Sequence, residues 1–139
     1  MSADTNRALA RRYFEEFLNR GDLSVADEIF EPNVVFRAPS VAFDDVDRLK
    51  RFFLLIRKTF PDLHYVAEEG ITEGDKVVSC FSSCGTFLTD LEGSQSNGKH
   101  FSIAGVVVFR IRKGRIAEVR CFYDSYEQMR QLGFIPLLG

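Results

Sequence analysis

One stretch of the sequence, FRIRKGRIAE at Phe109–Glu118, decides the fold class predicted for this chain. Apolar and charged residues alternate on both sides of Lys113-Gly114, and a period of two is typical of strands. The stretch therefore predicts a strand at His100–Arg112, a tight turn, and a second strand at Arg115–Tyr123. Working outward, the pattern predicts two earlier strands, Leu63–Ile71 and Lys76–Phe87, joined by a turn at Glu73-Gly74-Asp75, and a polar loop at Leu91–Gly98.

The first half of the chain has helical periodicity instead. Apolar residues at helical spacing predict amphipathic helices over residues 4–20 and 45–60, the second closed by Pro61. Ser24 is expected to cap a short helix that ends near Phe30, before a short strand at Asn33–Arg37. A last helix is expected at residues 125–131. The whole predicts one α+β domain over residues 1–139, with N-terminal helices followed by an antiparallel sheet. A curved sheet wrapped around helices readily encloses a cavity.

Composition excludes several classes of protein. The 139 residues are 45% apolar and 27% charged, which is ordinary for a globular domain and unlike a disordered chain. A net charge of −2 argues against nucleic acid as the main partner. The longest apolar runs, Phe52–Ile56 and Val106–Phe109, are far shorter than the ~20 residues of a membrane span. Three cysteines and a polar start without an apolar signal segment favour a reducing cytoplasmic location. Fourteen Phe without any Trp indicate an aromatic core or a ring-lined cavity.

Four motifs carry a resemblance to a known family: FPDLH at Phe60–His64, GK at Gly98–Lys99, FRIRKGRIAE at Phe109–Glu118 and MRQLG at Met129–Gly133. With the order of elements, they make the chain from about Leu9 to Gly133 resemble the SnoaL-like polyketide cyclases. That family belongs to the cone-shaped superfamily of nuclear transport factor two and ketosteroid isomerase. The resemblance implies a deep apolar pocket, no metal, no organic cofactor and, in the cyclase members, intramolecular aldol condensation of a polyketide ester.

The catalytic positions of the family carry over only in part. Cyclases of the family place an acid–base Asp on the last strand, three positions before a second Asp; this chain has Cys121 at the first position and Asp124 at the second. A family His on the preceding strand falls on Val107, and Phe36-Arg37 stands where many relatives have a His near the first strand. The resemblance therefore implies the fold more firmly than the cyclase reaction.

Three residues are candidates for acid–base chemistry. A Cys121 thiolate could act as base or nucleophile beside a cation, or the thiol could simply pack in the core. Asp124 could be catalytic, but Asp124 and Glu127 also form a capping box for the last helix. His64 could titrate near neutrality beside a carboxylate, or it could be a surface residue.

Six further residues are candidates for substrate binding: Tyr13, Phe17, Arg37, Phe53, Phe109 and Tyr123. Arg37 could donate to a ligand carbonyl or carboxylate, or lie at the surface. The rings could line the pocket or complete the core, because both uses need the same spacing. Strand alternation places Ala117, Val119, Cys121 and Tyr123 on the inward face of the last strand.

Two functions follow as expectations. The first is binding of a small, ring-shaped, polyketide-like hydrophobic ligand, with cofactor-free aldol cyclisation or isomerisation as the chemistry and hydroxylation left open. The alternative is a non-catalytic ligand-binding or dimerisation module. The outer sheet face, with Val106, Val108, Arg110, Glu118 and Arg120, is expected to be a partner surface. The resemblance implies that this surface forms a homodimer.

Overall fold

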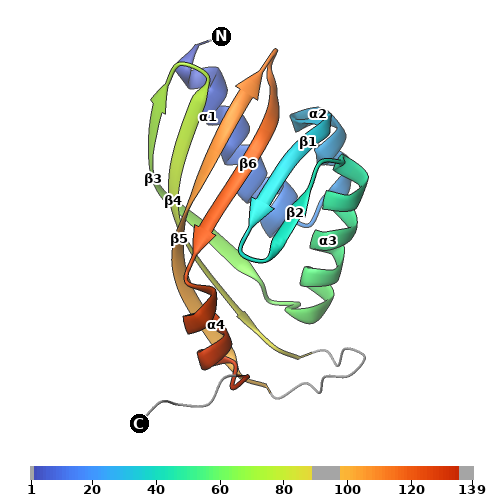
Figure 1. Ribbon diagram of the computed structural model, residues 1–139, viewed down its shortest axis with the longest axis vertical. Coiled ribbons are helices and arrows are strands. Elements are labelled where there is room, and N and C mark those ends of the chain that lie inside the picture. The colour runs from blue at the N-terminus through green and yellow to red at the C-terminus, as the bar shows by residue number, and fades with distance from the viewer. Residues whose placement is uncertain (1, 89–97, 135–139) are drawn as a thin grey trace.

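The computed structural model describes residues 2–88 and 98–134 and has the expected α+β fold (Figure 1). Most of the expected loop at Leu91–Gly98 lies outside the described residues. The helical elements are α1 (Ala3–Arg12), a π-helical segment (Tyr13–Asn19), a 3-10 turn (Leu23–Val25), α2 (Ala26–Ile29), α3 (Val46–Thr59) and α4 (Ser125–Gln131). The strands are β1 (Phe30–Ala38), β2 (Val41–Phe43), β3 (His64–Glu73), β4 (Lys76–Thr86), β5 (His100–Arg112) and β6 (Arg115–Tyr123).

The strands form one sheet in the order β2-β1-β6-β5-β4-β3. The predicted meander from β3 to β6 is confirmed as a series of antiparallel pairs. One pair departs from the expected antiparallel sheet, because β1 runs parallel to β6. No short turn joins these two strands, so no hairpin forces them to be antiparallel. The three-residue strand β2 was not predicted, since so short a segment shows no alternation.

The N-terminal helix extends over the predicted region but changes its winding. α1 runs to Arg12 and then continues as the π-helical segment, in which Tyr13, Phe14, Phe17 and Leu18 are all buried. The predicted cap of the next helix was wrong. Asp22, not Ser24, caps the 3-10 turn, and its carboxylate accepts a hydrogen bond from the Ser24 amide at 3.1 Å.

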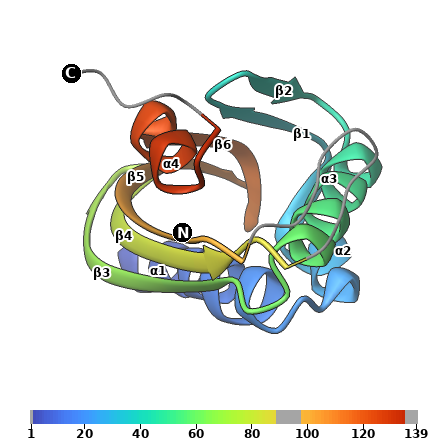
Figure 2. The same ribbon diagram turned by 90° about the horizontal axis from the view of Figure 1, so that it is seen from below.

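The sheet curves strongly, and helices close its concave side. Figure 2 shows this arrangement from below, with α1 and α3 facing the inside of the arc. Gly105 on β5 leaves no room for a side chain, because a Cβ atom would lie 2.7 Å from the ring of Phe81. The missing side chain lets that ring pack directly against the β5 backbone. α4 lies across the lower end of the sheet (Figure 1).

Candidate binding cavity

A cavity of about 240 Å³ lies between the helices and the concave face of the sheet. Ten aromatic residues form a large part of its walls: Tyr13, Phe14, Phe36, Phe52, Phe53, Phe60, Tyr65, Phe81, Phe101 and Tyr123. Among the residues that the structure describes, no Asp, Glu, His, Lys or Arg lines this cavity. The polar groups on the lining are neutral ones, contributed by Tyr13, Ser83, Tyr65, Cys121, Tyr123 and Gln128.

The π-helical segment builds the helical wall. Tyr13, Phe14 and Leu18 line the cavity, whereas Phe17 points into the neighbouring core. The Tyr13 ring is held edge-on against Phe109, with ring centroids 5.0 Å apart. Such edge-to-face contacts restrict the ring that reaches the cavity.

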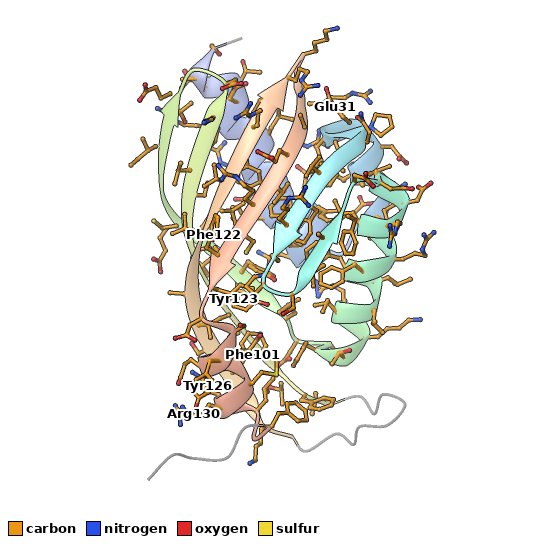
Figure 3. The ribbon with its side chains drawn as sticks, viewed as in Figure 1. Glu31, Phe101, Phe122, Tyr123, Tyr126 and Arg130 are labelled. Atoms are coloured by element: carbon orange, nitrogen blue, oxygen red, sulfur yellow. The ribbon has the colours of Figure 1, made fainter. Side chains whose placement is uncertain are left out.

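The sheet wall brings residues of all six strands together. Val107 on β5 pairs with Cys121 on β6, and Tyr65 on β3 pairs with Ser83 on β4. Because alternate residues of a strand face the same side, Cys121 and Tyr123 both face the cavity, as predicted. Figure 3 shows Tyr123 at the end of β6, close to the start of α4.

The helix α4 adds Gln128 and Met129 to the lining near the lower end of the sheet. The side chain of Gln131 holds this helix against β5 by pairing with the backbone of Ser102. The Ser102 amide donates to Gln131 Oε1 at 2.7 Å, and Gln131 Nε2 donates to the Ser102 carbonyl at 3.1 Å. The amide side chain thus replaces a strand neighbour at this end of the sheet.

Burial determines the electrostatics of the cavity. Desolvation raises the pKa of the Cys121 thiol to about 12, because the charged thiolate would lose its water. Desolvation also raises the pKa of Tyr13, Tyr65 and Tyr123, and the nearby Cys121 raises all three further. At neutral pH these four groups are therefore neutral hydrogen-bond donors.

Four of the predicted site residues line the cavity: Tyr13, Phe53, Cys121 and Tyr123. Two predicted rings do not line it and belong to the core behind it. Phe17 packs against Phe30 and Phe53, at centroid distances of 5.2 and 5.5 Å, and Phe109 is completely buried. The predicted spacing placed both rings on the inward face of their elements. Whether an inward ring reaches the cavity or stays in the core depends on neighbours that are distant in sequence.

Three predicted polar residues lie elsewhere. Arg37 is exposed, because its neighbour Phe36 takes the inward position on β1. His64 is exposed in an open surface groove between α1 and β3, because Tyr65 takes the inward position on β3. Asp124 caps α4 by accepting from the Glu127 amide at 2.9 Å.

The predicted capping box at α4 is therefore only half formed. The Glu127 side chain does not return to Asp124 but binds Arg130 with two hydrogen bonds of 2.6 Å. The hydrogen bonds from Arg130 and Gln131 lower the pKa of Glu127 to about 2. In this structure Asp124 therefore has a structural role, because it caps the first turn of α4.

Sequence reasoning missed several lining residues, of which Tyr65, Phe81 and Ser83 matter most. Alternation along β4 puts Phe81 and Ser83 on one face, and the same rule puts Tyr65 opposite His64 on β3. These signals were present in the sequence. What alternation alone does not tell is that a cavity separates these side chains from the helices.

The curved sheet closed by helices defines a cone-shaped α+β domain with the fold of nuclear transport factor two. A sequence model of the SnoaL-like polyketide cyclase family matches residues 8–132. The chain therefore belongs to the SnoaL-like polyketide cyclase family.

Solved structures share the fold across nearly the whole chain. A provisionally assigned SnoaL-like polyketide cyclase from Jannaschia sp. CCS1 superposes with a TM-score of 0.86 at 23% identity, covering 96% of this chain and 95% of that one. TsrD from Streptomyces laurentii gives 0.85 at 22% identity, with 97% and 99% covered. AclR, a provisionally assigned hydroxylase from Streptomyces galilaeus, gives 0.84 at 22% identity, with 99% and 87% covered. At such identities the likeness concerns the fold alone.

The sequence matches none of the curated proteins with which it was compared. Within residues 2–88 and 98–134, no helix is long and apolar enough to cross a membrane. The same residues contain no cluster of three or more His, Cys, Asp or Glu side chains that could hold a metal ion.

Proposed function

We propose that this protein binds a small, ring-containing, polyketide-like hydrophobic molecule in the cavity between its helices and its sheet. The observation that carries the proposal is the cavity itself, about 240 Å³ in volume and walled by aromatic side chains. A dry cavity of about 150 Å³ lined by Leu, Ile and Phe binds benzene. The larger cavity here is suited to a molecule of more than one ring.

The chemistry of the lining favours binding over proton transfer. Abstraction of a proton next to a carbonyl needs a base with a pKa near the working pH. The described lining has no carboxylate or imidazole, and burial keeps Cys121 protonated. Cofactor-free cyclisation or isomerisation remains the second candidate, supported by family membership and by the neutral donors, which can stabilise a developing oxyanion.

The binding proposal is tested by filling the cavity. 1-Aminoanthracene is a neutral probe whose fluorescence increases in apolar surroundings, and we expect saturable binding with one site per chain. Val107 is 2% exposed and lines the cavity, so Val107→Phe should weaken binding at least tenfold. Val66 is 47% exposed on β3, so Val66→Phe is the matched control and should bind like the wild type. Absence of wild-type binding, or equal loss in both variants, would contradict the proposal.

The cyclase alternative is tested by restoring the family's carboxylate. We expect wild-type protein to cyclise no polyketide ester faster than buffer does, whereas Cys121→Asp places an acid–base group in the cavity. Turnover by the wild type would favour the enzyme. If Cys121→Asp gains no turnover on any polyketide ester, the cyclase interpretation loses its main support.

We also propose that the outer face of the sheet joins two copies of the chain. Val78, Val106 and Val108 are half-buried on this face, and Phe122 is 53% exposed. Among the described residues, the buried Nε atoms of Arg110 and Arg120 have no hydrogen-bond partner, although Arg120 Nε forms an ion pair with Glu118 at 3.6 Å. A mixture of apolar side chains and unsatisfied donors is suited to a contact that supplies acceptors.

A further inference from the structure

Helix α3 carries a charge opposite to that of the chain as a whole. Its 14 residues include five Lys or Arg side chains and one Asp, so the helix has a net charge of +4 in a chain of net charge −2. The rest of the chain is therefore strongly acidic. A basic helix with an apolar component is typical of contacts with acidic partners or with membrane surfaces.

Two cations on the outer side of α3 have no partner in the fold. Lys50 is paired, because its ammonium lies 2.8 Å from a carboxylate oxygen of Asp27. Arg51 and Lys58 are both exposed, and within residues 2–88 and 98–134 neither forms a hydrogen bond or an ion pair. Their charges are therefore available to a molecule outside the fold.

The acidic side chains that flank α3 are already engaged. Asp45 caps the first turn by accepting from the Asp47 amide at 2.7 Å. Asp62, which follows the helix, accepts from the amide and the hydroxyl of Thr86 at 2.7 and 2.8 Å. The C-terminal half of α3 thus presents its positive charge to solvent.

Exposed leucines lie between these cations. Leu54 is 44% exposed and Leu55 is 50% exposed. Leu88, which is 54% exposed, lies beside the end of the helix, because its amide donates to the Thr59 carbonyl at 3.4 Å. Residues three, four and seven positions apart share one face of a helix. The cations and leucines therefore form one surface, the α3 patch, which consists of Arg51, Leu54, Leu55, Lys58 and Leu88.

The position of α3 relates this patch to the cavity. The inner face of the helix lines the cavity with Phe52, Phe53 and Ile56. Figure 2 shows α3 at the outside of the molecule, beyond the arc of the sheet. The outer surface of a single helix is convex, and a lipid bilayer needs no shape-matched groove to receive it. Leucines that enter the bilayer interface remove apolar area from water, while anionic headgroups attract the neighbouring cations.

We infer that the α3 patch binds the surface of an anionic lipid bilayer. The contact is peripheral and needs no membrane-spanning segment. The inference goes beyond the proposed function and does not depend on it. It places one wall of the cavity against the phase in which hydrophobic molecules dissolve.

The experiment compares two kinds of vesicle. The wild type should sediment with vesicles of phosphatidylcholine that contain about 30% phosphatidylglycerol, but not with phosphatidylcholine alone. Each cation near an anionic surface contributes about 1 kcal/mol, which is about fivefold in the partition coefficient. Arg51→Glu/Lys58→Glu should therefore weaken binding at least about twentyfold. Raising the salt from about 0.1 M to about 1 M should also weaken wild-type binding, because it shortens the range of the attraction.

Two further variants separate the apolar part from the charge. Leu54→Ser/Leu55→Ser should weaken binding and leave its salt dependence unchanged, since it removes no charge. Lys76→Glu/Arg115→Glu is the matched control, because it changes the net charge equally at two exposed residues. Lys76 begins β4, whereas Leu88 follows the end of that strand, so the control lies at the other end of the sheet (Figure 1). It should bind vesicles like the wild type, and circular dichroism checks that every variant is folded.

The possible results decide between the lipid and an acidic protein. Equal binding to both vesicle types, no binding to either, or unchanged binding of Arg51→Glu/Lys58→Glu overturns the inference. Binding of poly-L-glutamate without binding of vesicles would assign the patch to an acidic protein and also overturn it. The Arg51→Glu/Lys58→Glu variant should still bind 1-aminoanthracene, because neither residue lines the cavity. Failure of the ligand proposal therefore gives a different result from failure of this one.

Discussion

At the scale of single residues, the sequence position of Cys121 suggests an acid–base role, whereas its surroundings in the fold oppose that role. From the family resemblance an acid–base Asp is expected at this position, and the residue faces the cavity as alternation predicted. Its surroundings nevertheless hold it protonated, since burial raises the pKa of the thiol to about 12. A group in this state can donate a weak hydrogen bond, but it is a poor base at neutral pH.

The state of the thiol predicts its reactivity. We expect iodoacetamide to modify Cys121 more slowly at pH 8 than Cys80 and Cys84, with the rate still rising above pH 9. Peptide mass spectrometry resolves the three rates, and 1-aminoanthracene should protect Cys121 alone. Fast alkylation of Cys121 with a midpoint below about 8.5 would show a reactive thiolate instead.

The same pKa predicts a pH dependence of stability. Well below pH 9.0, which is the pKa of the thiol in the unfolded chain, the thiol is protonated in both the folded and the unfolded chain and adds no pH dependence. As the pH rises above 9.0, only the unfolded chain releases this proton, so the free energy of unfolding falls by up to about 1.4 kcal/mol per pH unit. Urea unfolding between about pH 8 and pH 10.5 should show a steeper fall for the wild type than for Cys121→Ser. Equal slopes would mean that the thiol is not desolvated.

At the scale of elements, two side-chain amides complete the edges of strands. Asn19, the last residue of the π-helical segment, pairs with the backbone of Tyr65 at the start of β3. Gln131 does the same for Ser102 on β5. Both satisfy backbone groups that no neighbouring strand reaches, and both connect a helical element to a cavity wall.

The Asn19 pairing predicts a matched series of variants. Asn19→Leu leaves the amide and the carbonyl of Tyr65 without this partner, so we expect a loss of about 1–3 kcal/mol in the free energy of unfolding. Asn19→Asp keeps the acceptor for the Tyr65 amide but not the donor for its carbonyl, and should lie between Leu and wild type. Urea denaturation measures all three. A Leu variant as stable as the wild type would show that the pairing contributes nothing.

At the scale of the whole molecule, the proposed role of the outer sheet face predicts that the protein is a dimer. We expect the wild type to elute at twice its chain mass of 15.8 kDa in size-exclusion chromatography with light scattering. Phe122→Arg puts a charge in the centre of the proposed contact and should give a monomer. Leu55 is equally exposed but lies on α3, so Leu55→Arg should remain dimeric. A monomeric wild type would contradict the proposed assembly.

The sequence by itself determined those features that depend on near neighbours in the chain. The periods of apolar residues located both long helices and the strands of the meander, and alternation on β6 placed Cys121 and Tyr123 inward. The turn at Lys113-Gly114 fixed the β5–β6 hairpin. Side-chain direction within one element follows from backbone geometry, so it needs no knowledge of the rest of the fold.

Only the tertiary structure decided which of the inward residues face empty space. Phe17 and Phe53 both follow helical spacing, and Phe109 and Phe81 both follow strand alternation. Phe17 and Phe109 nevertheless complete the core, whereas Phe53 and Phe81 line the cavity. The parallel pairing of β1 with β6 and the raised pKa of Cys121 also depend on contacts between distant segments. A cavity is the volume that packed elements leave unfilled, and the cost of charging a buried group depends on everything around it.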